Sequence, residues 1–415
     1  MSSKSNSKSK SVKSTADNDS VSVDGARCTV TASGDGSSVF DRGDHNRLTL
    51  TGDNQSANLS GDDADLLSTG ANAFVMLDGR GNSAQVNGAN AFVIANGSCN
   101  DVTVRGLGSV VDDGGSHNLT VLQGERESAN LRGRDGAVVS LGDGNLIGLQ
   151  GTDNSAIIWG DDSLLMDNGI GNRTWLAGDN GNARLIGADG ELLVTGDGSV
   201  INMIGLHNTT IVTGDDANVL DVGTGDTLVL LGDNASAMLL GTDSHLTSAG
   251  RNNWISVSGN AEIDATRATI VLGDGASASL DGERNSVAMG AGATLTVTGK
   301  LDDVIHGSVG DDADVLAFGG SFRHDQLWFA ESDGDLVISV IGKKRSLTVS
   351  DWFDQPESTI GTVKTSDGFS ISDEGIDQLV QAMSAFSPPS SGNGHYAHVT
   401  ADALAPTLAA NWQHG

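Results

Sequence analysis

Residues 52–69 read GDNQSANLSGDDADLLST, which is two nonapeptides that both begin with Gly-Asp. The spacing extends in both directions, and every ninth residue from Gly25 to Gly259 is glycine. Glycine makes up 57 of the 415 residues, so chance does not produce an unbroken series of this length. A fixed period is the signature of a repeat architecture, in which each repeat is one small structural unit.

Within each nonapeptide, the sixth and eighth residues are usually Val, Leu, Ile or Ala. This alternation predicts a short strand with one buried face. A strand of this length cannot bury its apolar face alone, but a stack of such strands can, so the pattern predicts a parallel β-solenoid. Glycine at each corner would supply a backbone conformation that a residue with a Cβ atom resists. The predicted structural corner residues include Gly25, Gly34, Gly43, Gly52, Gly61, Gly142, Gly160, Gly178, Gly196, Gly214, Gly232 and Gly259.

The number of nonapeptides in one coil is inferred from the third position of the repeat. In steps of 27, this position gives one series of aspartates and one of glycines, whereas a step of 18 mixes the two types. We therefore predict a three-sided solenoid with nine residues per side and 27 per coil. The two series are Asp135, Asp162, Asp189, Asp216 and Asp243, and Gly144, Gly171, Gly198 and Gly225.

Asparagine recurs at the fourth position of the repeat. An inward amide beside a bend can bond main-chain groups that the corner leaves unpaired, so we expect a structural role; a ligand-binding ladder is the alternative. The same frame places Cys28 and Cys99 on separate coils, too far apart for a disulfide, and predicts two free thiols. It also places the outward aromatic side chains on different coils, as isolated surface groups. The asparagines are Asn46, Asn82, Asn118, Asn154 and Asn208, and the aromatic residues are Phe74, Phe92, Trp175 and Trp254.

The composition limits the classes of partner. The formal net charge is -31, from 54 acidic and 23 basic residues, which disfavours nucleic acid and anionic membranes and favours divalent cations. Residues 1–24 are rich in Ser and Lys and lack an apolar core, so we predict a disordered arm rather than a signal peptide. No apolar run long enough to cross a bilayer occurs, and we expect no membrane insertion.

The composition changes at Lys300, which is the first lysine after Lys13. We therefore place the solenoid at residues 25–299, a small β-rich module at residues 300–355 and a C-terminal region at residues 356–415. The stretch LWFAESDGDLVISVIGKKRSLTVSDWF predicts three strands joined by turns, the first an Asp-Gly turn. Apolar residues at helical spacing behind Ser372 and Asp373 predict one amphipathic helix over residues 373–386.

The C-terminal part also resembles a known family. DQLWFAESDGDLVISVIGKKRSLTVSDWF, DGFSISDEGIDQLVQAMSAF and LAPTLAANWQ follow one another in residues 301–415 and are similar to the haemolysin-type calcium-binding-related module of RTX-type proteins. This resemblance implies a substrate of bacterial type I secretion. It implies an uncleaved C-terminal export signal read by the secretion machinery, and an extracellular destination in a Gram-negative bacterium.

Calcium ions (Ca2+) are the cofactor that the resemblance implies. The repeat shares the nine-residue length of the RTX nonapeptide but lacks its second and third glycines, so the family's calcium sites carry over only to GSVGDDADV at residues 307–315. The candidate ligands there are Asp311, Asp312 and Asp314. Aspartates at the other corners would solvate the bends and block sideways pairing of strands; calcium binding along the solenoid is the alternative.

These features favour a secreted, acidic, non-enzymatic protein that is calcium-responsive and acts as an extracellular matrix, adhesion or surface-interaction element of a biofilm matrix. One alternative is a ligand-binding module for glycans or ice. A second is a polysaccharide lyase or epimerase, which needs a cation and a base, although residues 14–299 contain no lysine. A third is a secreted toxin or effector. The open end of a solenoid also favours end-to-end self-association.

Overall fold

In the computed structural model of the protein, residues 3–5, 11–308, 314–355, 360–387 and 398–414 are described. The chain divides into two compact units, Met1–Gly214 and Asp215–Gly415. Both contain parallel β-solenoid, so the predicted all-β solenoid fold is confirmed.

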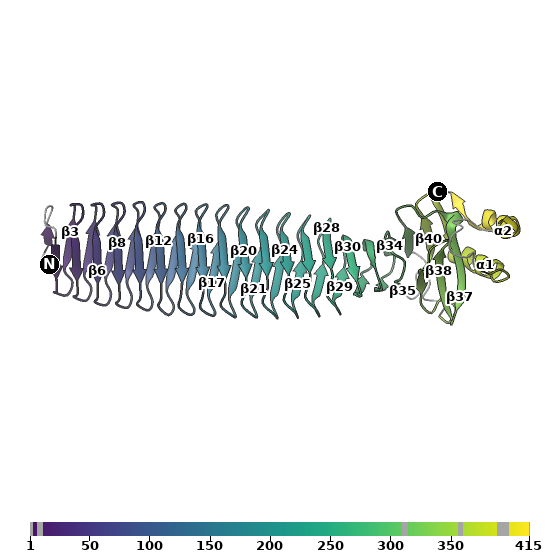
Figure 1. The fold of residues 1–415 in the computed structure, drawn as a ribbon, viewed down its shortest axis with the longest axis horizontal. Coiled ribbons are helices and arrows are strands. Elements are labelled where there is room, and N and C mark those ends of the chain that lie inside the picture. Colours follow the sequence, from purple (N-terminus) through teal and green to yellow (C-terminus); the bar gives the residue numbers. More distant parts are fainter. Residues whose placement is uncertain (1–2, 6–10, 309–313, 356–359, 388–397, 415) are drawn as a thin grey trace. The chain divides into compact units, whose positions relative to one another are not determined.

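The first unit is a stack of short strands, of four residues each except the three-residue β1, joined by short turns (Figure 1, purple to teal). Alternate strands belong to two parallel sheets. The odd-strand sheet contains β1 (Ser3–Ser5), β3 (Ser20–Val23), β5 (Ser38–Asp41), β7 (Ser56–Leu59), β9 (Phe74–Leu77), β11 (Phe92–Ala95), β13 (Val110–Asp113), β15 (Ser128–Leu131), β17 (Leu146–Leu149), β19 (Leu164–Asp167), β21 (Asn182–Leu185) and β23 (Val200–Met203). The even-strand sheet contains β2 (Ser11–Ser14), β4 (Thr29–Ala32), β6 (Arg47–Leu50), β8 (Asp65–Ser68), β10 (Ser83–Val86), β12 (Asp101–Val104), β14 (Leu119–Leu122), β16 (Ala137–Ser140), β18 (Ser155–Ile158), β20 (Arg173–Leu176), β22 (Glu191–Val194) and β24 (Thr209–Val212).

The second unit contains solenoid strands of the same kind and ends in an antiparallel module. Its solenoid strands are β25 (Asn218–Asp221), β26 (Thr227–Leu230), β27 (Ser236–Leu239), β28 (Ser244–Ser248), β29 (Trp254–Val257), β30 (Asn260–Thr266), β31 (Thr269–Leu272), β32 (Ser277–Glu283), β33 (Ser286–Met289), β34 (Thr294–Val297), β35 (Val304–His306) and β36 (Val315–Phe318). The module contains the 3-10 helix η1 (His324–Gln326), β37 (Leu327–Ser332), β38 (Asp335–Val340), β39 (Ser346–Val349), β40 (Thr362–Thr365), β41 (Phe369–Ser372), α1 (Asp373–Met383), α2 (His398–Asn411) and β42 (Gln413–His414).

The predicted three-sided coil is wrong, because each strand pairs with the next strand but one in the sequence. Ser56 pairs with Phe74, and Phe74 pairs with Phe92, each in parallel and each at a sequence offset of 18. One coil therefore has two sides, with one strand in each sheet. Inside it, the sixth and eighth residues of each nonapeptide alternate with exposed or half-buried ones, as in the pattern of β9.

The prediction of three sides from the third position of the repeat failed for a stereochemical reason. This residue has a positive φ in turns at both edges of the solenoid, as at Asp135 (φ 54°), Gly144 (φ 65°) and Asp162 (φ 55°). Only glycine and residues such as Asn and Asp adopt this conformation readily. The series of aspartates and glycines at a step of 27 therefore reflects a backbone requirement common to both edges, rather than contact between successive coils.

The corner glycines are required by close packing rather than by a positive φ. A Cβ atom on Gly43 would lie 2.2 Å from the carbonyl oxygen of Gly25, one coil earlier, and one on Gly160 would lie 1.9 Å from that of Gly142. Real Cβ atoms essentially never approach so closely. The glycine series therefore allows successive turns to stack directly on one another.

The predicted disordered arm is also wrong from residue 11 onward. β2 and β3 are solenoid strands, and Val21 and Val23 are fully buried. The same frame continues upstream of Gly25, with Ala16 in the place of glycine and Asn18 at the positive-φ position. These strands were not predicted because the many Ser and Lys residues obscure the regular alternation of buried and exposed positions.

The solenoid extends past the predicted boundary at residue 299. β35 pairs in parallel with β33, and β36 pairs in parallel with β34. The frame of the repeat changes after Gly259, since Trp254 of β29 pairs with Thr269 of β31 at an offset shorter than the regular 18.

In the antiparallel module, β37, β38 and β39 form the predicted three-stranded arrangement, with Asp333 and Gly334 in the first turn. The predicted helix at residues 373–386 corresponds to α1, which ends earlier, at Met383. Ser372 caps it by accepting a hydrogen bond from the main-chain N–H of Gly375. α2 lies beside α1 (Figure 1) and was not predicted.

Candidate functional site

The five predicted asparagines all lie in turns that lead into the even-strand sheet, and all are buried. Asn154 shows the arrangement: its Oδ1 accepts a hydrogen bond from the main-chain N–H of Gly136 (2.9 Å), and its Nδ2 donates to the carbonyl of Gly133 (3.1 Å). Because both ends of the amide bond the preceding coil, this position stabilises the turn. Equivalent pairs of bonds are made by Asn46, Asn82, Asn118 and Asn208.

The second residue of the turns that lead into the odd-strand sheet is often aspartate. Asp143 Oδ1 accepts a hydrogen bond from the main-chain N–H of Asp161 (3.0 Å), and Asp161 accepts one from Asp179 (2.8 Å). These exposed carboxylates therefore lie one coil apart in a column. Strands in one sheet are about 4.8 Å apart, so the like charges of the column repel one another.

A second set of carboxylates lies inside the solenoid. Asp41, Asp113 and Asp167 occupy the eighth position of their repeats, where an apolar residue usually stands, and all are buried. Burial raises the pKa of each carboxyl, and hydrogen bonds from an asparagine in the next turn and from a glycine N–H partly offset this. Glu127 is buried at a fourth position, and burial raises its pKa to about 7.

We expect the stability of the first unit to fall as the pH rises from 5 to 8. The pKa of Glu127 is higher in the folded chain than in the unfolded one, so its contribution is complete below pH 4.5 and is lost as the pH rises through about 7. Glu127→Gln should reduce this loss by about 3 kcal/mol. Urea unfolding at several pH values measures the slope.

The matched control is Glu125→Gln, which removes the same charge from an exposed position in the same turn. It should leave the pH dependence unchanged. Equal slopes in the wild type and Glu127→Gln would contradict the assignment.

The outward face of the even-strand sheet carries the most continuous apolar surface of the first unit. The seventh residue of the repeat is apolar in six successive strands of this sheet, and the strands pair in register, so these side chains form one column: Val121, Val139, Ile157, Trp175, Leu193 and Ile211. A shallow depression of about 370 Å³ over β18, β20, β22 and β24 includes Ile157, Trp175, Leu193 and Ile211 of this column in its lining.

Trp175 is the centre of this apolar column. Its ring centroid lies 4.8 Å from that of Trp159, which is 49% exposed, and its Nε1 donates to Thr195 Oγ1 (3.0 Å). Beside the column, Nε of Arg173 lies 3.0 Å from a carboxylate oxygen of Glu191, so these two charges neutralise each other. The column is therefore a nearly uncharged strip on a strongly acidic chain.

The prediction that the outward aromatic side chains are isolated is wrong, because strands pair at a sequence offset of 18. Phe74 and Phe92 lie on neighbouring strands of the odd-strand sheet, and their rings stack at 5.9 Å. A step of 18 in the sequence would have revealed both this pair and the column on the other sheet. Cys28 and Cys99 are free thiols, as expected, the first buried and the second exposed.

Of the three predicted calcium ligands, Asp311 and Asp312 lie outside the described residues. Asp314 is buried, and its Oδ2 accepts a hydrogen bond from the main-chain N–H of Ser308 (3.0 Å).

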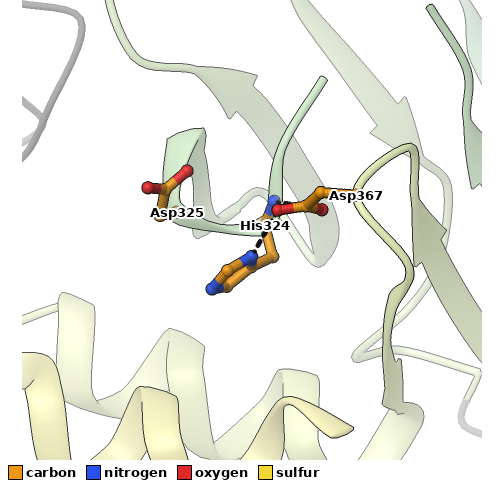
Figure 2. Close-up of side chains that lie close together, drawn as sticks. All are labelled: His324, Asp325 and Asp367. Carbon is orange, nitrogen blue, oxygen red and sulfur yellow. Dashed lines mark hydrogen bonds and ion pairs between the residues drawn. The ribbon is translucent and has the colours of Figure 1, made fainter. Parts of the chain in front are cut away.

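A different group of potential ligands, which the sequence did not suggest, is formed by His324, Asp325 and Asp367, whose ligand atoms lie within 4.8 Å of one another. Figure 2 shows His324 facing Asp367, with an Nδ1–Oδ2 distance of 2.7 Å. Partial burial tends to raise the pKa of Asp367, but hydrogen bonds from Thr365 and His324 outweigh it and lower the pKa overall.

The surroundings of this group favour a structural role. The ring of His324 stacks on Phe369 at 3.8 Å, and the guanidinium of Arg323 lies 3.1 Å from Asp325 and 3.9 Å from Asp367. A positive charge at that distance disfavours a bound cation. Asp367 is far from His324 in the sequence, so no local motif indicated the cluster.

A comparison with models of known protein families finds no match for this chain. Within the described part of the chain, neither helix has the length and apolarity needed to cross a bilayer.

Proposed function

We propose that this chain is a non-enzymatic extracellular protein that attaches to surfaces or matrix through the apolar column on the even-strand sheet. The observation that carries this proposal is the unbroken series from Val121 to Ile211, which forms a regular and nearly uncharged strip. Exposed apolar surface of this continuity is typical of interaction sites. Asp143, Asp161 and Asp179, in the turns on one side of the strip, favour solubility of the chain.

Export by a type I secretion system is part of the same proposal. It is supported by the motifs in residues 301–415 that resemble the RTX-type module, and it places the protein outside a Gram-negative cell. Deletion of residues 356–415, in a host that carries such a system, is expected to leave the chain inside the cells. Export of the shortened chain would contradict this.

Calcium response is supported by the net charge of -31 and by the column of carboxylates at Asp143, Asp161 and Asp179. Divalent cations prefer carboxylate oxygens and reduce repulsion between them. End-to-end association of the solenoid remains part of the proposal, because strand edges at its end can pair with another copy.

Attachment through the strip predicts a specific loss of adsorption. Trp175→Ser combined with Leu193→Ser should lower the binding of the full chain to alkyl-coated sensors and to intact Gram-negative cells by about tenfold. A quartz crystal microbalance measures both, in a chelator and in millimolar calcium, and calcium should increase binding.

The matched control is Leu164→Ser combined with Met166→Ser, which removes two outward apolar side chains from β19 on the opposite sheet. This variant should bind as the wild type does. Equal binding by all three proteins would reject the strip as the site of attachment.

A further inference from the structure

The lysines of this protein are distributed very unevenly. Only Lys300, Lys343, Lys344 and Lys364 follow Lys13 in the sequence. The first three of these line a single cavity of about 410 Å³ in the second unit, together with Arg345. In a chain with a net charge of -31, these four basic residues form a local concentration of positive charge.

Part of the positive charge is held in place by acidic residues at the edge of the cavity. Arg345 is paired with Glu283 and lies 3.6 Å from Asp302, and Lys300 lies 3.8 Å from Glu283. Lys343 and Lys344 are exposed and make no ion pair with any residue in the described ranges. The cavity thus has four basic groups against two acidic ones, and two lysines remain available to a ligand.

The remainder of the cavity wall is apolar. Leu301 is buried, and Phe322 is half-buried, with its ring edge-on to the buried ring of Phe318 at a centroid distance of 6.0 Å. This contact supports Phe322 from behind and leaves part of its surface to the cavity. An aromatic face beside cations suits a ligand that has both an apolar ring face and a negative charge.

A second cavity, of about 420 Å³, shares Phe322 and Lys343 with the first. Its wall adds polar groups from Ser321, Gln326 and Gly342. Sites for small molecules commonly measure about 300–1,000 Å³ and combine an apolar wall with a few polar groups, so each cavity has room for one small ring.

We propose that these two cavities, which share Phe322 and Lys343, together bind a small sugar that carries one anionic group, either a carboxylate or a phosphate. Lys343 and Lys344 bind the anion, Phe322 packs against the ring, and Ser321 and Gln326 meet hydroxyl groups. The negative charge of the whole chain repels long polyanions. At moderate salt, screening limits the range of this repulsion to about 10 Å, so the nearby lysines dominate the electrostatic interaction with a small ligand. This inference does not depend on the attachment proposed for the first unit.

The test is calorimetric titration of the full-length protein with galacturonate, with glucose 6-phosphate and with neutral glucose. We expect one site per chain for at least one of the two anionic sugars, weaker binding at higher salt, and no binding of glucose. The stronger of the two anionic sugars identifies the natural charge group. Failure of both to bind, or equal binding of glucose, overturns the proposal.

The variant Lys343→Gln with Lys344→Gln should weaken binding at least about tenfold, since it removes both available charges. Both side chains are exposed, so the fold is expected to persist, and an unchanged melting temperature checks this. Lys364→Gln is the matched control, because Lys364 lines neither cavity, and it should bind as the wild type does. Unchanged affinity in the double variant overturns the proposal.

Discussion

Replacing Gly115 by alanine is expected to lower the free energy of unfolding of the first unit by about 3 kcal/mol. The new Cβ atom would lie 1.9 Å from the carbonyl oxygen of Gly97 and 2.5 Å from Nδ2 of Asn118. The first contact is with the main chain of the preceding coil, so it can be relieved only by separating two stacked turns. Urea unfolding followed by circular dichroism measures the change.

The neighbouring residue provides a matched control. A Cβ atom on Gly114 would have its closest contact at 3.5 Å, from Asn96 Oδ1, which is an ordinary van der Waals distance. Gly114→Ala should therefore change the stability by less than about 1 kcal/mol, and alanine can even stabilise by restricting the unfolded chain. Similar losses for both variants would show that close stacking of the turns is not the reason for the glycine series.

Replacing Asn154 by alanine should have an effect of similar size. The substitution leaves the buried N–H of Gly136 without its acceptor. The carbonyl of Gly133 loses Asn154 Nδ2 as a donor but keeps the hydrogen bond from the main-chain N–H of Thr152 (3.2 Å). A buried main-chain group left without a partner costs about 1–3 kcal/mol, so a loss of this size is expected. The same urea titration measures it.

Asn168→Ala is the comparison for this variant, because Asn168 is an exposed asparagine that directly follows a strand of the same solenoid. It should be close to neutral. If Asn154→Ala loses no more stability than Asn168→Ala does, the buried asparagines do not stabilise the solenoid in the way argued above.

The sequence was sufficient for the features that depend on one repeat alone. The glycine period and the apolar alternation predicted parallel strands with one buried face, as seen in β9. The number of strands in a coil could not be predicted in the same way, because the third position of the repeat has a positive φ at both edges and therefore favours glycine, Asp and Asn in both. The helix α2 was missed because Pro406 and a weakly amphipathic sequence conceal it.

The candidate sites depend on contacts between distant parts of the chain, and the sequence predicted them least well. The pairing of His324 with Asp367 and the approach of Lys300 to Lys343 join segments that are far apart in the sequence. The apolar column from Val121 to Ile211 was present in the sequence as a series at a step of 18. It was overlooked because the assumed three-sided coil placed its members on different sides.

The two-sided coil is tested most directly by disulfide formation between introduced cysteines, in a chain with Cys28→Ala and Cys99→Ser. Ser38 and Ser56 are paired outward residues of neighbouring strands, with their Oγ atoms 2.9 Å apart, so Ser38→Cys with Ser56→Cys should form a disulfide on mild oxidation. Ser38→Cys with Asp65→Cys should not, because these two positions, which a three-sided coil would stack on each other, lie on opposite sheets. Efficient crosslinking of the second pair, and none of the first, would contradict the two-sided coil.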